Sequence, residues 1–156
     1  MRIKFLAVMV VLLGFISINI CMAADHATKD EVIAMVQAAV KMAQEQGRDA
    51  ALAEVADPHG KFVWKDSYVF ALNSADAMTM AHPIKPKLVG KNLLHIKDVN
   101  GVMIFVEFAK IAKSPTGKGW VDYMWPKPGE KKPSPKHTYI EVVPGEDVMM
   151  GSGYYE

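Results

Sequence analysis

Two proline-containing stretches of this sequence combine a restricted backbone with side chains that can hold a small anion. The first runs from Met80 to Lys91 and includes His82, and the second, at residues 123–129, reads Tyr-Met-Trp-Pro-Lys-Pro-Gly. Proline restricts the backbone, while imidazole, ammonium and aromatic groups can pair with an anion and cover its apolar part. Because each stretch adjoins a strand-like segment, the pair predicts a binding pocket rather than a reaction centre.

Lys127 is the residue of these stretches that we expect to supply charge to a ligand. It follows Trp125 within the same rigid turn and has a proline on each side. A lysine held in this way could pair with a carboxylate. The alternative interpretation is a solvated lysine of a hairpin loop, because three further lysines follow before residue 137.

Histidine and aromatic residues supply the remaining candidates for the pocket. His82 could donate to a carboxylate oxygen, or it could hold its own loop in place through a backbone group. Strand alternation places Tyr68 with Phe70 on one face of a strand, and Tyr123 with Trp125 on one face of another. These aromatic side chains are predicted to line the pocket, although aromatic residues on a sheet also form ordinary core.

Met80 completes the predicted ligand site, and its neighbours raise a second hypothesis. Met78, Met80 and His82 form a Met-x-Met-x-His pattern whose soft ligands would suit Cu(I) on one face of a strand. Apolar packing explains the two methionines as well. The other histidines lack paired spacing, so no metal or cofactor is assigned. The chain shows no pairing of a base with a nucleophile, and we therefore do not expect an enzyme.

The N-terminal segment predicts export from the cytoplasm. Arg2 and Lys4 precede an apolar run at residues 5–20, and Cys-Met-Ala follows at residues 21–23. The run is shorter than the roughly 20 residues of a bilayer span, which favours a cleaved secretory signal peptide at 1–23. An uncleaved anchor and lipidation of the cysteine are the alternatives.

Composition restricts the class of the remaining chain. Removing 23 of 156 residues leaves 133 for 24–156, which suits one domain. Cys21 is the only cysteine, so the mature chain would form no disulfide. Removing Arg2 and Lys4 from 18 basic residues leaves 16 against 17 acidic ones, a balance that gives no support for nucleic-acid binding. We expect a soluble periplasmic domain without an output module of its own.

The order of predicted elements indicates an α+β fold. Thr28 and Glu31 form a capping box before a long amphipathic helix that ends near Gly47. The other expected elements are a short helix at 48–56, strands at 68–72 and 77–81, an ordered loop at 82–91, a helix at 102–112, and strands at 119–125, 137–143 and 147–154. A helical start followed by mainly consecutive strands argues for an antiparallel sheet with helices packed on it.

From about Asp30 to Tyr155 the chain resembles a single Cache domain, the extracytoplasmic relative of the PAS-type sensor fold. The motifs that carry the resemblance are Tyr68-Val-Phe, residues 80–93, Asp98-Val-Asn-Gly, Phe105-Val-Glu-Phe, residues 119–128 and Met150-Gly-Ser-Gly-Tyr-Tyr. The resemblance implies a long N-terminal helix beside a curved PAS-like sheet, with a small-molecule pocket between the sheet and its covering loops. It also implies short organic acids as ligands and a sensory role.

These observations lead to a periplasmic single-Cache protein that binds a short-chain carboxylate. The expected partners are a small organic acid and a separate membrane receptor, kinase or transporter. Two alternatives remain open, an exported Cu(I)-binding protein and an interaction domain that binds no ligand and acts through its long helix. A homodimer through the N-terminal helix is also left open.

Overall fold

The computed structural model describes residues 26–156. The predicted signal peptide at 1–23 therefore lies outside the described residues. Among the described helices, none combines the length and apolarity that a bilayer span requires.

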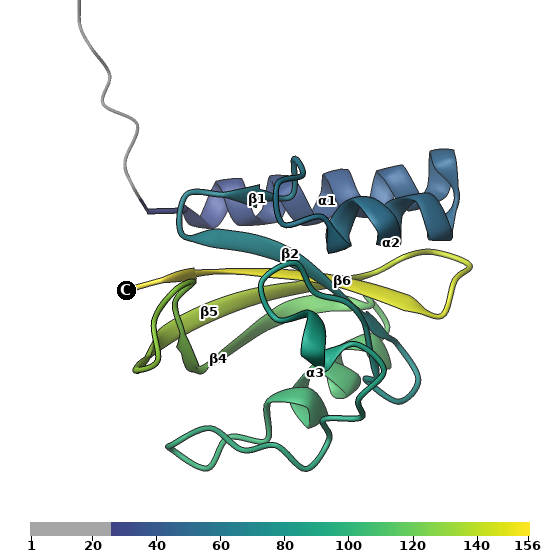
Figure 1. Ribbon diagram of the computed structural model, residues 1–156. Helices are drawn as coiled ribbons and strands as arrows, with labels where there is room; N and C mark the ends of the chain where they lie inside the picture. The colour runs from purple at the N-terminus through teal and green to yellow at the C-terminus, as the bar shows by residue number, and fades with distance from the viewer. Residues whose placement is uncertain (1–25) are drawn as a thin grey trace, which may run out of the picture.

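Two consecutive helices form one layer of the molecule (Figure 1). Helix α1 spans Lys29–Gln46 and α2 spans Arg48–Ala56. The predicted capping box is confirmed, because Thr28 Oγ1 accepts from the Glu31 N–H at 3.3 Å and Glu31 Oε2 accepts from the Thr28 N–H at 2.8 Å. Gly47, with φ of 90°, separates the two helices in a conformation that favours glycine.

A six-stranded antiparallel sheet forms the centre of the domain, in the order β1-β2-β6-β5-β4 with β3 paired to β2. Its strands are β1 (Val63–Trp64), β2 (Ser67–Asn73), β3 (Thr79–Ala81), β4 (Lys118–Pro126), β5 (Pro133–Val142) and β6 (Val148–Tyr155). The 3₁₀ helix η1 (Pro86–Leu88) and helix α3 (Ile104–Ala112) lie in the connection between β3 and β4. The predicted α+β class with a long N-terminal helix is confirmed.

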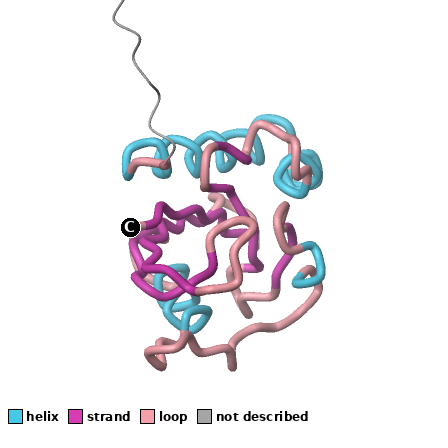
Figure 2. Tube along the Cα trace, turned by 60° about the vertical axis from the view of Figure 1, so that its left-hand side comes forward, coloured by secondary structure: helices cyan, strands magenta, loops and turns pink. Residues whose placement is uncertain are grey.

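The sheet carries a separate apolar cluster on each face. Helices α1 and α2 cover one face, and α3 with the loops between β3 and β4 covers the other (Figures 1 and 2). Strand alternation divides β2 between them: Val69 and Ala71 pack toward α1 and α2, whereas Tyr68, Phe70 and Leu72 pack toward α3. We call these the helix-side cluster and the loop-side cluster.

Several element boundaries differ from the sequence prediction. Strand β5 begins at Pro133, because residues 133–136 pair with β4, so Lys136 belongs to a strand and not to a loop. Strand β3 begins only at Thr79, since Ala77 has a φ of 57° that interrupts an extended backbone. The short strand β1 was not predicted.

The predicted common face of Met78, Met80 and His82 does not form. The strand is too short to hold all three, because it ends at Ala81 and leaves Met78 outside. Met80 packs against the helix-side cluster, whereas His82 stacks on aromatic rings of the loop-side cluster. The expectation that these residues share one strand face was therefore wrong.

Two glycines of β6 allow close packing with its neighbours and lead to a prediction. A Cβ atom at Gly153 would lie 2.6 Å from the backbone oxygen of His137, whereas one at Gly151 would meet the ends of Phe70 and Ile140 at 2.6 and 2.5 Å. Side-chain ends can move more easily than backbone. We expect Gly153→Ala to lower the free energy of unfolding by about 2–3 kcal/mol, and Gly151→Ala by less. Urea unfolding of both variants tests this order, and a larger loss in Gly151→Ala would contradict it.

Candidate functional site

A small cavity lies on the loop side of the sheet, between β2, β3, β4 and α3. Its aromatic wall consists of Tyr68, Phe70, Phe105, Phe108, Tyr123 and Trp125. The cavity has a volume of about 20 Å³, roughly the space that one water molecule needs. A ligand of several heavy atoms would therefore bind only after the lining side chains move apart.

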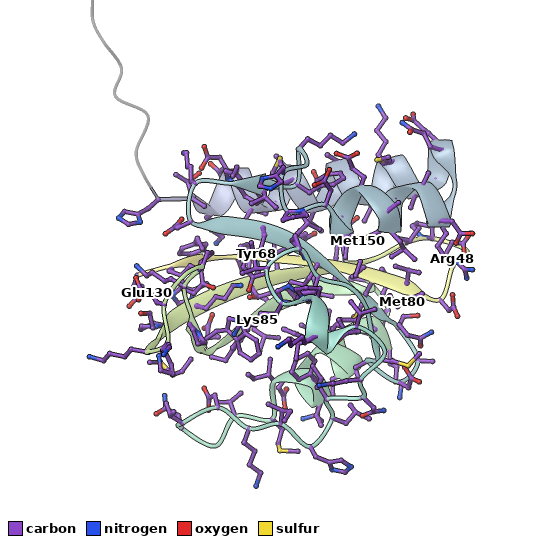
Figure 3. All side chains as sticks on the ribbon, in the orientation of Figure 1. Arg48, Tyr68, Met80, Lys85, Glu130 and Met150 are labelled. Carbon is purple, nitrogen blue, oxygen red and sulfur yellow. The ribbon has the colours of Figure 1, made fainter. Side chains whose placement is uncertain are left out.

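Five of the seven predicted ligand-binding residues line this cavity: Tyr68, Phe70, His82, Tyr123 and Trp125. Met80 and Lys127 do not line it. Figure 3 shows Met80 farther along the sheet, away from Tyr68. The ammonium of Lys127 lies 5.7 Å from the centre of the Tyr155 ring. The ligand-binding roles assigned to these residues remain predictions.

Lys136 is the charged group that the sequence analysis did not select. It is only 1% exposed, and its Nζ donates to the Tyr68 hydroxyl at 3.2 Å. The same Nζ lies 4.3 Å from the centre of the Tyr68 ring and 4.9 Å from that of Tyr155. None of the ion pairs within residues 26–156 involves Lys136. A buried ammonium without an acidic partner is costly.

The environment of Lys136 lowers the pKa of its ammonium group. The pKa of Lys136 is lowered to about 7, chiefly by burial and in smaller part by the positive charge of Lys85, while Asp66 acts in the opposite direction. A bound anion would provide the missing counter-charge and raise this pKa.

The alternation of side chains along β5 could have indicated from the sequence that Lys136 faces the loop-side cluster. Ile140 packs into the loop-side cluster, and counting back in steps of two reaches Thr138 and then Lys136. Thr138 donates to the Tyr123 hydroxyl at 2.9 Å, which places this row of side chains beside the aromatic wall. The sequence analysis missed the signal because it began this strand at residue 137 instead of residue 133.

His82 presents a neutral imidazole to the cavity. Its Nδ1 accepts from the backbone N–H of Lys85 at 3.1 Å, so the ring proton belongs on Nε2, which is a donor. Burial lowers the pKa of His82 to about 3, and the charges of Lys136 and Lys85 contribute in the same direction. The ring centre lies 4.9 Å from that of Tyr68. His82 therefore stabilises its loop and offers a hydrogen bond at the polar end of the cavity.

Lys85, which belongs to the covering loop, contacts Trp125 of strand β4. Its ammonium lies 4.4 Å from the centre of the Trp125 ring, a cation–π contact, and partial burial lowers its pKa. Tyr68 and Lys85 lie at the same end of the sheet in Figure 3. The contact joins the two proline-containing stretches that the sequence analysis selected separately.

The cavity as a whole is polar at one end and apolar along its walls. Tyr68 and His82 line the polar end, and the Lys136 ammonium donates to the Tyr68 hydroxyl without lining the cavity itself. Phe70 and Phe108 present apolar rings. Such a site can hold a small amphipathic anion, with its charge at Lys136 and its carbon chain against the rings. Residues 26–156 contain no group of three or more His, Cys, Asp or Glu side chains placed to hold a metal ion.

Comparisons with known proteins identify the family to which this fold belongs. The model of the Cache domain family matches residues 25–156. The chain belongs to the Cache domain family, whose members are sensory ligand-binding domains and not enzymes.

Chemoreceptors are prominent among the similar proteins. The methyl-accepting chemotaxis protein McpP of Pseudomonas putida is 36% identical over 90 residues, which are 58% of this chain but only 16% of the receptor's length. A Cache chemosensory domain solved as the structural basis for carboxylic acid recognition has a TM-score of 0.68 and 27% identity, covering 81% of this chain and 91% of the other. A methyl-accepting chemotaxis protein of Vibrio parahaemolyticus has a TM-score of 0.67 and 28% identity over 81% of this chain and 87% of the other.

Proposed function

We propose that this protein binds a short-chain carboxylate in the loop-side cavity and that Lys136 is the charge partner of the carboxylate. The observation that carries the proposal is a lysine that is 1% exposed, without an ion-pair partner among the described residues, beside an aromatic cavity. Lys127 was selected from the sequence for this role, and neither lysine lines the cavity itself. Lys136 is preferred because its ammonium donates to the hydroxyl of Tyr68, a lining residue, whereas that of Lys127 lies near the Tyr155 ring. Carboxylic acid recognition by a similar Cache domain supports the ligand class.

We further propose that the protein acts in the periplasm after removal of residues 1–23 and reports the acid to a separate membrane receptor, kinase or transporter. The extracytoplasmic character of Cache domains and the similarity to chemoreceptors support this placement and role. Protein recovered from the periplasm should begin at Ala24 or Asp25, and an intact Met1 in the membrane fraction would contradict the proposal.

Thermal unfolding with small acids tests the carboxylate assignment. Acetate, propionate, pyruvate and lactate are the acids to compare, with propionamide as an uncharged control of matched shape. At a hundredfold excess over Kd, an acid should add about 2.7 kcal/mol to the free energy of unfolding, which is several degrees in Tm for a domain of this size. The amide should have little effect. If no acid shifts Tm at millimolar concentration, the carboxylate assignment fails.

A further inference from the structure

Thr79 carries a polar group without a partner in the wall of the cavity. Its side chain is 1% exposed, and its Oγ1 accepts and donates no hydrogen bond within residues 26–156. Leu72 lies opposite Thr79 in the strand pairing, and Leu88 and Leu93 line the same cavity. A buried hydroxyl in an apolar wall destabilises the fold unless something satisfies it. The indole N–H of Trp64 is also unpartnered, but it lies in the helix-side cluster.

Thr79 and Tyr68, the residue that Lys136 contacts, line different parts of the cavity. Thr79 pairs with Leu72, whereas Lys136 donates to Tyr68, which comes four residues earlier on β2. A strand rises roughly 3.3 Å per residue, so these two positions of β2 are about 13 Å apart. The long side chains of Tyr68 and Lys136 shorten this gap, and the ring of Phe70 lines the space between. A ligand whose carboxylate meets Lys136 would reach Thr79 only with the far end of its carbon chain.

We propose that the cavity selects acids that carry a hydroxyl or oxo group remote from the carboxylate, and that Thr79 recognises this group. This inference rests on the proposed carboxylate function. A hydroxyl or carbonyl group can satisfy the Thr79 Oγ1. A second carboxylate would be buried among leucines, because no cationic side chain within residues 26–156 lines the cavity there. 4-Hydroxybutyrate, whose hydroxyl lies at the opposite end of the carbon chain from the carboxylate, is a simple acid of this kind.

Calorimetric titration of the full chain with butyrate and 4-hydroxybutyrate tests this selection, because the two acids share one carbon chain. The wild-type protein should bind the hydroxy acid about tenfold more tightly or better. Thr79→Val keeps the shape but removes the hydroxyl, so the preference should disappear while butyrate still binds. Thr79→Ser retains the hydroxyl and should retain the preference. Without ligand, Thr79→Val should melt at the same temperature as wild type or higher, since the unpartnered group is gone.

Propionate and lactate form a second pair, in which the hydroxyl lies next to the carboxylate. Their affinity ratio should not depend on Thr79. Equal wild-type affinities for butyrate and 4-hydroxybutyrate would overturn the inference. Equal weakening of both acids by Thr79→Val would overturn it as well. The Thr79 hydroxyl would then bind a water molecule or stabilise the cavity wall, and it would not recognise the ligand. In either case, continued binding of butyrate leaves the carboxylate function standing, whereas failure of all four acids would remove both.

Discussion

Replacement of Lys136 by methionine should abolish carboxylate binding while the unliganded domain becomes more stable. Lys136 is buried with no ion-pair partner among the described residues, and methionine fills a similar volume without a charge to desolvate. Loss of the charge partner of a buried anion costs about 2–5 kcal/mol, so the affinity should fall by roughly 30-fold to several thousandfold. Removal of the buried ammonium should raise the free energy of unfolding by about 1 kcal/mol or more. Thermal unfolding with and without acetate measures both effects.

Two further lysine variants make the test specific. Lys131→Ala changes an exposed lysine outside the cavity and is the matched control, which should bind acids like wild type. Lys127→Ala tests the residue selected from the sequence. If Lys127→Ala abolishes the acid-induced shift of Tm and Lys136→Met does not, the assignment to Lys136 is wrong and the sequence-based choice is right.

The stability of the unliganded domain should rise between pH 7 and pH 9 because of Lys136. Its pKa is about 7 in the folded chain and near its ordinary value of 10.5 in the unfolded chain. Between these values the unfolded chain binds more protons, so the free energy of unfolding increases with pH by up to about 1.4 kcal/mol per pH unit. Below about pH 7 both states are protonated and this contribution to the slope vanishes. Urea unfolding across the pH range measures it.

The difference between wild type and Lys136→Met isolates this contribution. Tyr68 and Tyr155, which contact Lys136, have raised pKa values and stay protonated in the window, and His82 stays neutral. Any effect of Lys85 is present in both proteins. A difference that stays constant from pH 7 to pH 9 would show that Lys136 does not titrate there.

Carboxylate affinity should show the opposite dependence on pH. The acid is already ionised at pH 7, but Lys136 must take up a proton to pair with it. Affinity should therefore fall as pH rises above about 7, by up to tenfold per unit, until the raised pKa of the liganded lysine is reached. Titration of acetate at pH 6, 7, 8 and 9 measures this fall, and an affinity that stays constant from pH 7 to pH 9 would contradict it.

Short-range patterns in the sequence were sufficient for much of the fold. The Thr28–Glu31 capping box and the apolar repeat of α1 act within a few residues, so they could be read without tertiary information. Strand alternation correctly paired Tyr68 with Phe70, and Tyr123 with Trp125, on the faces that meet at the cavity. The Cache resemblance implied a pocket between the sheet and its covering loops, which is where this cavity lies.

Tertiary structure alone decided which charge was buried and which side chains faced each other. Lys136 belongs to a strand because β5 pairs with β4 as far as Pro133. It is buried because Tyr155 of the neighbouring strand β6 and Tyr68 of β2 lie against its ammonium. Met80 and His82 separate onto opposite faces because β3 ends between them. Periodicity tells which residues share a face of one element, but the register between distant strands determines what that face meets, and only the folded chain sets that register.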